Sequence, residues 1–133
     1  MSSTLTRSVE LAARILLALL FLLSGVNKIA QYSGTAGYME AAGVPAALLP
    51  VVIVVEVLGA LALIVGWKTR LVSFLLAGYT VLAALIFHAK IGDPNQLAHF
   101  LKNLSIAGGL LLLVVNGAGP LSVDRRAPDR RGQ

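Results

Sequence analysis

Formal charge is missing from four long stretches of this 133-residue chain. Residues 15–27, 71–89 and 103–123 contain no Lys, Arg, Asp or Glu, and residues 41–67 contain only Glu56. A bilayer core about 30 Å thick is crossed by roughly 20 mostly apolar helical residues. The pattern predicts an all-α integral membrane protein, a bundle of four transmembrane helices near residues 10–31, 47–66, 70–90 and 98–117.

The composition excludes the other common classes of protein. Hydrophobic residues make up 57% of the chain and charged residues 13%, against about 25% charged residues in a soluble domain. A single soluble domain of this length would leave much of that apolar surface in water. Intrinsic disorder is excluded as well, because disordered chains are poor in hydrophobic residues. The absence of cysteine excludes disulfide frameworks, thiolate metal sites and covalently attached c-type haem.

Glycine and proline mark the expected connections between the helices. Residues 33–37 (SGTAG) predict a flexible loop after the first helix. Two prolines predict a short interfacial segment at 46–49, with the second helix beginning properly at Pro50. Residues 92–95 (GDPN) predict a turn before the last helix.

The lysines and arginines predict the orientation. Four helices place both termini and the connection near residue 68 on one side, which carries eight of the eleven basic residues. Basic residues favour the cytoplasmic side, so we expect both termini to be cytoplasmic. Residues 1–120 form the expected membrane domain. Residues 121–133 are expected to be a disordered basic tail near anionic headgroups, with no role in nucleic-acid binding.

A group of polar side chains lies where the lipid-spanning helices should be apolar. Glu56 is the sharpest case, roughly 9 Å below the outer membrane edge if counted from Pro50. Ionisable residues at such depths are costly and are functional candidates. We expect a polar cluster in the outer half of the bundle, with either Lys28 or Lys102 paired to Glu56. Its expected members are Asn27, Lys28, Glu56, His88, His99, Lys102 and Asn103.

The sequence contains no recognisable catalytic constellation. His88 and His99 have no accompanying carboxylate pair, so we expect hydrogen-bonding roles for them and no metal site. Small residues in lipid mainly allow close helix packing. We assign that role to Gly25, Gly59, Gly108 and Gly109.

Three segments resemble the signatures of the DoxX family, and the resemblance covers roughly residues 8–116. They are residues 21–28 (FLLSGVNK), 56–59 (EVLG) with the Thr69-Arg70 pair, and 99–104 (HFLKNL) with Gly108-Gly109. The resemblance implies a small, four-helix, multi-pass protein of the bacterial inner membrane. Relatives are linked to thiosulfate:quinone oxidoreduction, oxidative-stress complexes or quinone resistance, and distant eukaryotic relatives act as cargo receptors or chaperones.

The resemblance leaves three functions open. The first is an accessory, non-catalytic or quinone-associated subunit of a membrane oxidoreductase or oxidative-stress complex, with quinone as the candidate cofactor. The second is a membrane scaffold or chaperone without a redox role. The third is a small oligomeric transporter in which Glu56 titrates. In each case the expected partners are the lipid bilayer and other membrane proteins, in a homo-oligomer or a complex.

Overall fold

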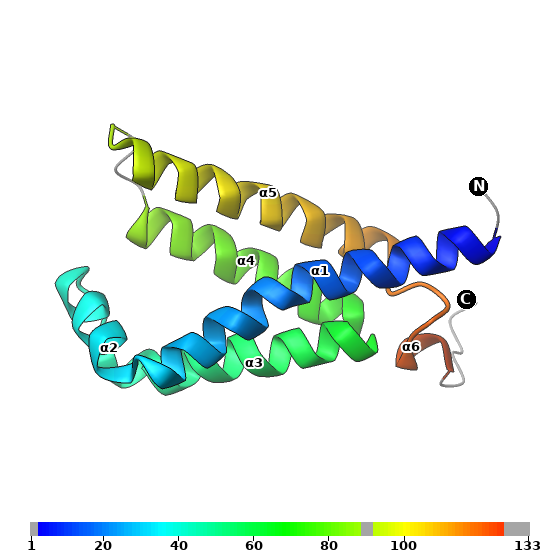
Figure 1. Ribbon diagram of the computed structural model, residues 1–133, viewed down its shortest axis with the longest axis horizontal. Helices are drawn as coiled ribbons and strands as arrows, with labels where there is room; N and C mark the ends of the chain where they lie inside the picture. The colour runs from blue at the N-terminus through cyan, green and yellow to red at the C-terminus, as the bar shows by residue number, and fades with distance from the viewer. Residues whose placement is uncertain (1–2, 89–91, 127–133) are drawn as a thin grey trace.

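The chain is helical along nearly all of the residues that the computed structural model describes, 3–88 and 92–126. Figure 1 shows the arrangement, and no strand occurs in these two ranges. The elements are α1 (Ser3–Ala30), α2 (Tyr32–Ala41), the 3₁₀ turn η1 (Ala46–Leu48), α3 (Leu49–Val65), α4 (Thr69–Phe87), α5 (Pro94–Asn116) and α6 (Val123–Arg126).

Four helical segments are long and apolar enough to cross a membrane, which confirms the predicted fold class. They are Ser3–Ala30, Ala46–Val65, Thr69–Phe87 and Pro94–Asn116. The 3₁₀ turn before α3 occupies most of the predicted interfacial segment at 46–49. The last spanning helix begins four residues earlier than expected, because Asp93 caps it by accepting a hydrogen bond from the backbone N–H of Asn95. Residues 89–91, at the end of the third predicted helix, lie outside the described residues.

The helices form two closely packed pairs. Helix α1 packs along α3 and α4 packs along α5, and the main contact between the pairs is that of α3 with α4. The pairs diverge toward the end of the molecule at which α2 lies (Figure 1). We call this the α2 end, and the opposite end, with the α3–α4 connection and α6, the terminal end. The core between the pairs includes Phe21, Leu63, Leu76 and Leu110, all at most 4% exposed.

Three of the four glycines assigned to packing lie at helix contacts. A Cβ on Gly25 would lie 2.6 Å from Cγ2 of Val57, so the side chain of Val57 on α3 packs directly against the backbone of α1 there. Gly59 and Gly109 would meet leucine side chains at 3.0 and 3.3 Å. Nothing lies within 4 Å of the Cβ position of Gly108. The adjacent Gly109 takes the inward side of the turn, which leaves Gly108 on the outer face.

The loop expected at residues 33–37 is instead part of α2. Thr35 contributes to this, because its backbone N–H and its hydroxyl both donate to the carbonyl of Gln31, at 2.9 and 3.0 Å. Met39 on the same helix is buried and anchors it. The chain reverses later, at Gly43, whose φ of 82° is a conformation that glycine adopts without strain.

Arg14 is one of the eight basic residues that predict the cytoplasmic side, but its side chain is fully buried in the terminal end. Nη1 donates to the carbonyls of Leu63 and Ile64 at 2.8 and 3.2 Å, and Nη2 donates to the carbonyl of Leu121. The last carbonyls of a helix lack partners within the helix. Arg14 therefore caps the end of α3 and ties it to α1.

The start of the basic tail is folded against the bundle. The carboxylate of Asp124 accepts hydrogen bonds from the backbone N–H groups of Lys68 and Thr69, at 2.7 and 2.8 Å, and so caps α4. The Asp124 N–H in turn donates to the carbonyl of Gly66 at 2.9 Å. Residues 121–126 thus differ from the expected disordered tail, because these bonds hold them. Residues 127–133 lie outside the described residues.

Candidate ligand cavity

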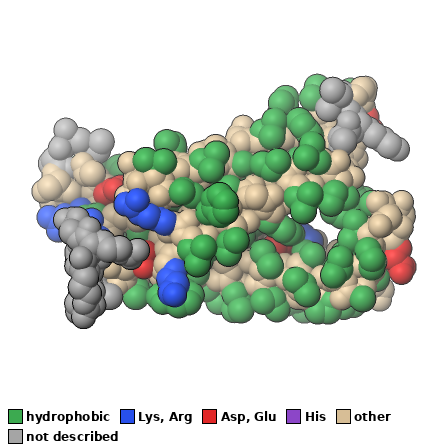
Figure 2. Space-filling model, turned by 180° about the vertical axis from the view of Figure 1, so that it is seen from behind, with side chains coloured by type: hydrophobic (Ala, Val, Ile, Leu, Met, Phe, Trp, Pro, Cys, Tyr) green, Lys and Arg blue, Asp and Glu red, His purple; other side chains and the backbone are tan. Residues whose placement is uncertain are grey.

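A cavity of about 650 Å³ lies between the two helix pairs at the α2 end, with walls from all five helices α1 to α5. Apolar side chains form most of its wall. Figure 2, which views the molecule from behind, shows the surface hollowed between hydrophobic side chains, with basic and acidic side chains visible inside the hollow. The cavity lies where the two helix pairs diverge (Figure 1).

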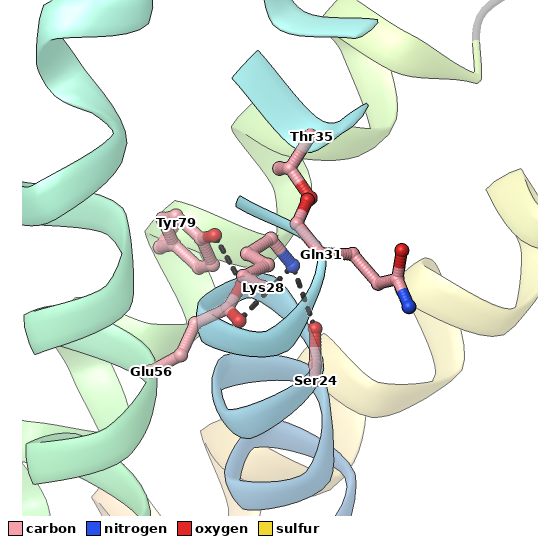
Figure 3. Close-up of polar contacts among 6 residues, drawn as sticks. All are labelled: Ser24, Lys28, Gln31, Thr35, Glu56 and Tyr79. Atoms are coloured by element: carbon pink, nitrogen blue, oxygen red, sulfur yellow. Dashed lines mark hydrogen bonds and ion pairs between the residues drawn. The ribbon is translucent and has the colours of Figure 1, made fainter. Parts of the chain in front are cut away.

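A charged cluster at the cavity wall joins three helices (Figure 3). Glu56 of α3 has a side chain only 5% exposed, and its Oε1 lies 3.1 Å from Nζ of Lys28 on α1. Tyr79 of α4 donates its hydroxyl proton to the other carboxylate oxygen, Oε2. Lys28 also donates to Oγ of Ser24 at 2.7 Å. Each oxygen of the buried carboxylate therefore has a donor, which is the condition for keeping a charge inside a protein.

Lys28 is thus the partner of Glu56, which settles the alternative left open between Lys28 and Lys102. The Lys28 ammonium carries three protons, two of which are donated to Ser24 and Glu56. The third has no acceptor within residues 3–88 and 92–126. Lys28 lines the cavity and its side chain is 23% exposed. Lys28 therefore offers a charged donor to a molecule in the cavity.

Five other members of the predicted cluster lie on or near the same cavity. Asn27, His88, Lys102 and Asn103 line it, and Asn103 donates from Nδ2 to the carbonyl of Thr80 at 3.4 Å. His99 is not part of the wall. It stacks behind His88, with ring centroids 5.0 Å apart, and its Nδ1 lies 3.4 Å from Nζ of Lys102.

His88 makes its polar contact within the protein. Its Nδ1 lies 2.8 Å from Oε1 of Gln96, on the first turn of α5. No group of three or more His, Cys, Asp or Glu side chains able to hold a metal occurs in the part of the chain that the structure describes. The arrangement therefore offers hydrogen-bond donors and acceptors around an apolar space.

Two side chains that complete the charged cluster were missed from the sequence, Ser24 and Tyr79. Tyr79 had a signal, because it is the only tyrosine within the charge-free run 71–89. A buried tyrosine hydroxyl usually has a hydrogen-bond partner. Ser24 had no such signal in the sequence, since serine bonds to its own helix backbone as readily as to a side chain.

A ring contact that the sequence did not indicate joins α2 to α4 at the cavity wall. Tyr38 of α2 stacks on Phe87 of α4, with centroids 5.4 Å apart. Tyr38 also lines the cavity, together with Met39 of the same helix. Helix α2 therefore reaches across the open end of the two helix pairs.

Comparison with known proteins agrees with this membrane architecture. The chain is 46% identical to the inner membrane protein YqjF of Escherichia coli over 86% of this chain and 88% of that protein. It is 40% identical to the inner membrane protein YphA of the same organism, over 87% and 88% of the two chains. A more distant relative is the ER-derived vesicles protein ERV29 of Saccharomyces cerevisiae, 34% identical over 56% of this chain and 26% of that protein.

No solved structure matches the chain. The model of one family, DoxX, matches residues 9–89, which include both members of the Lys28–Glu56 pair and Tyr79. This match spans more than half of the sequence and agrees with the resemblance carried by residues 21–28 and 56–59. The chain belongs to the DoxX family.

Proposed function

We propose that this protein is a non-catalytic, quinone-binding accessory subunit of an oxidoreductase in the bacterial inner membrane, with both termini cytoplasmic. The observation that carries the proposal is the cavity between the helix pairs, into which Lys28 presents a charged hydrogen-bond donor. The names of the two bacterial relatives support the inner membrane as its location.

The dimensions and chemistry of the cavity fit a quinone. Small-molecule sites typically enclose about 300–1,000 Å³, with apolar walls and a few polar groups, and this cavity has about 650 Å³. A quinone ring is flat and largely apolar, and its carbonyl oxygens accept hydrogen bonds but donate none. Lys28 supplies a matching donor, and the amide groups of Asn27 and Gln31 on the wall supply further ones.

The residues of this chain would hold and orient the quinone carbonyl, while the quinone would supply the redox chemistry when bound. Glu56 and Tyr79 act indirectly in this arrangement. Tyr79 bonds to Glu56, and Glu56 bonds to Lys28, so together they fix the Lys28 ammonium at the wall. A fixed charged donor binds a carbonyl better than a mobile one, because less conformational freedom is lost on binding.

The test is the quinone content of the protein extracted from native membranes in detergent-free polymer discs and measured by mass spectrometry. We expect wild type to carry quinone, and Lys28→Met to lower that content about tenfold, since a charged hydrogen bond contributes about 1.5–3 kcal/mol. Lys68→Met makes the same chemical change at the terminal end and serves as the control. Wild type without quinone, or Lys28→Met with unchanged quinone, would refute the proposal.

The double variant Lys28→Met/Glu56→Gln removes both charges, and so keeps the quinone test valid if Lys28→Met alone fails to fold.

Two further measurements separate the remaining functions. A scaffold or chaperone role predicts that the double variant loses co-purifying membrane proteins while its quinone content does not change. A transporter role predicts a solute flux in liposomes that Glu56→Gln abolishes.

A further inference from the structure

The cavity has an apolar border between α3 and α4. Leu48 of η1 and Val51 of α3 line the cavity and are 47% and 57% exposed. Across from them, Leu82 and Ile86 of α4 also line it and are 56% and 42% exposed. These four residues form the α3–α4 border. Because each belongs both to the wall and to the surface, the cavity is continuous with the lipid-facing surface there.

The opposite border, between α1 and α5, has different chemistry. It mixes Leu20 with three exposed polar side chains on the cavity wall, Asn27, Gln31 and Lys102. An alkyl chain lying against these groups would separate them from water or lipid headgroups, at a free-energy cost. The α3–α4 border is therefore apolar, whereas the α1–α5 border is polar.

We infer that the ligand is a long-chain amphiphile taken from the bilayer, with its headgroup at Lys28 and its tail leaving the cavity across the α3–α4 border. The inference rests on the proposed function, because it states where the tail of the molecule bound in that cavity lies. Figure 2 shows charged side chains within a hollow that hydrophobic side chains largely surround, as this arrangement requires.

The open border explains how such a molecule could bind without bending its tail into the cavity. Lipid chains are as apolar as leucine, so moving a tail from lipid to this border gains little free energy. The border instead removes a penalty, since a closed wall would exclude any ligand longer than the cavity. The open border therefore predicts that the protein binds ligands with and without a long tail. Closing the border should weaken the binding of the tailed ligand alone.

The test compares two probes, a decyl-tailed dimethoxy-methyl-benzoquinone and the same ring without the tail, binding to the full-length protein in lipid nanodiscs. Probe concentrations are expressed per lipid, so that partitioning does not enter the comparison. Val51→Trp and Leu82→Trp close the border from its two sides. Val54→Trp and Leu85→Trp are the matched controls, because these positions are 52% and 56% exposed on the same helices but are not part of the wall.

For wild type and both controls we expect affinities for the two probes that agree within about threefold. The two border variants should bind the tailed probe about tenfold or more weakly and the ring alone as wild type does. Unchanged binding of the tailed probe, or equal loss of both probes, in Val51→Trp and Leu82→Trp would overturn the inference while leaving quinone binding intact. If neither probe binds wild type, the proposed function itself fails.

Discussion

Removing the Lys28 ammonium should destabilise the protein more than removing both charges of its pair with Glu56. In Lys28→Met the Glu56 carboxylate, 5% exposed, retains only the hydroxyl of Tyr79 as a donor. Breaking a buried ion pair from one side costs about 3–5 kcal/mol, because the remaining charge is left without a partner.

Glu56→Gln should cost less, about 1–2 kcal/mol. The amide oxygen still accepts a hydrogen bond from Tyr79, and Lys28, 23% exposed, keeps its bond to Ser24 and faces the cavity. In Lys28→Met/Glu56→Gln no charge is buried alone. We therefore expect the double variant to be more stable than Lys28→Met by about 2 kcal/mol, since neutral replacements of a buried pair are often tolerated.

The free energy of unfolding can be measured by steric trapping in micelles at neutral pH, with Tyr79→Phe as a comparison that removes one neutral donor. A double variant as unstable as Lys28→Met would refute the reasoning, because no unpaired charge would then be relieved. A cost below about 1 kcal/mol for Lys28→Met would also refute it, by showing that Glu56 does not depend on the Lys28 ammonium as its partner.

Three further predictions follow from other parts of the structure. Arg14→Met should lower the free energy of unfolding by about 2–4 kcal/mol, measured in the same way, because three backbone carbonyls at the terminal end lose their donor; an unchanged value would contradict this. Gly25→Ala should destabilise by about 1–3 kcal/mol through overpacking, and Gly108→Ala should be neutral within about 0.5 kcal/mol. Because the chain has no cysteine, Ser3→Cys and Gly92→Cys should be labelled from the cytoplasmic and the outer side of the membrane respectively, and the reverse pattern would disprove the predicted orientation.

The number and approximate position of the spanning helices could be predicted from the sequence alone, although the first helix begins at Ser3 and not near residue 10. Whether a stretch of about 20 residues can lie in hydrocarbon depends on the charges and backbone polar groups of that stretch itself. The same reasoning identified Glu56 as an exception inside the second helix. That identification needs only the position of Glu56 along one helix, so no knowledge of the neighbouring helices was required.

Local patterns were less reliable where a contact from elsewhere decides the conformation. The glycines at 34 and 37 favour a loop, yet α2 continues through both, with Met39 buried at its far end. Arg14 has the position of a charge beside the membrane, but carbonyls of residues 63, 64 and 121 surround it. Those partners lie at least 49 residues away in the chain, beyond the reach of any local pattern.

The sequence by itself determined that this is a four-helix membrane protein with a polar cluster near one end, because burial of charge in lipid is a property of each helix separately. It left Lys28 and Lys102 equally able to reach Glu56. Only the tertiary structure decided for Lys28, through the rotation of α1 against α3 and the contribution of Tyr79 from α4. Outside and inside are equally apolar for a helix in lipid, so periodicity does not mark its buried face. That rotation depends on the packing of one helix against another.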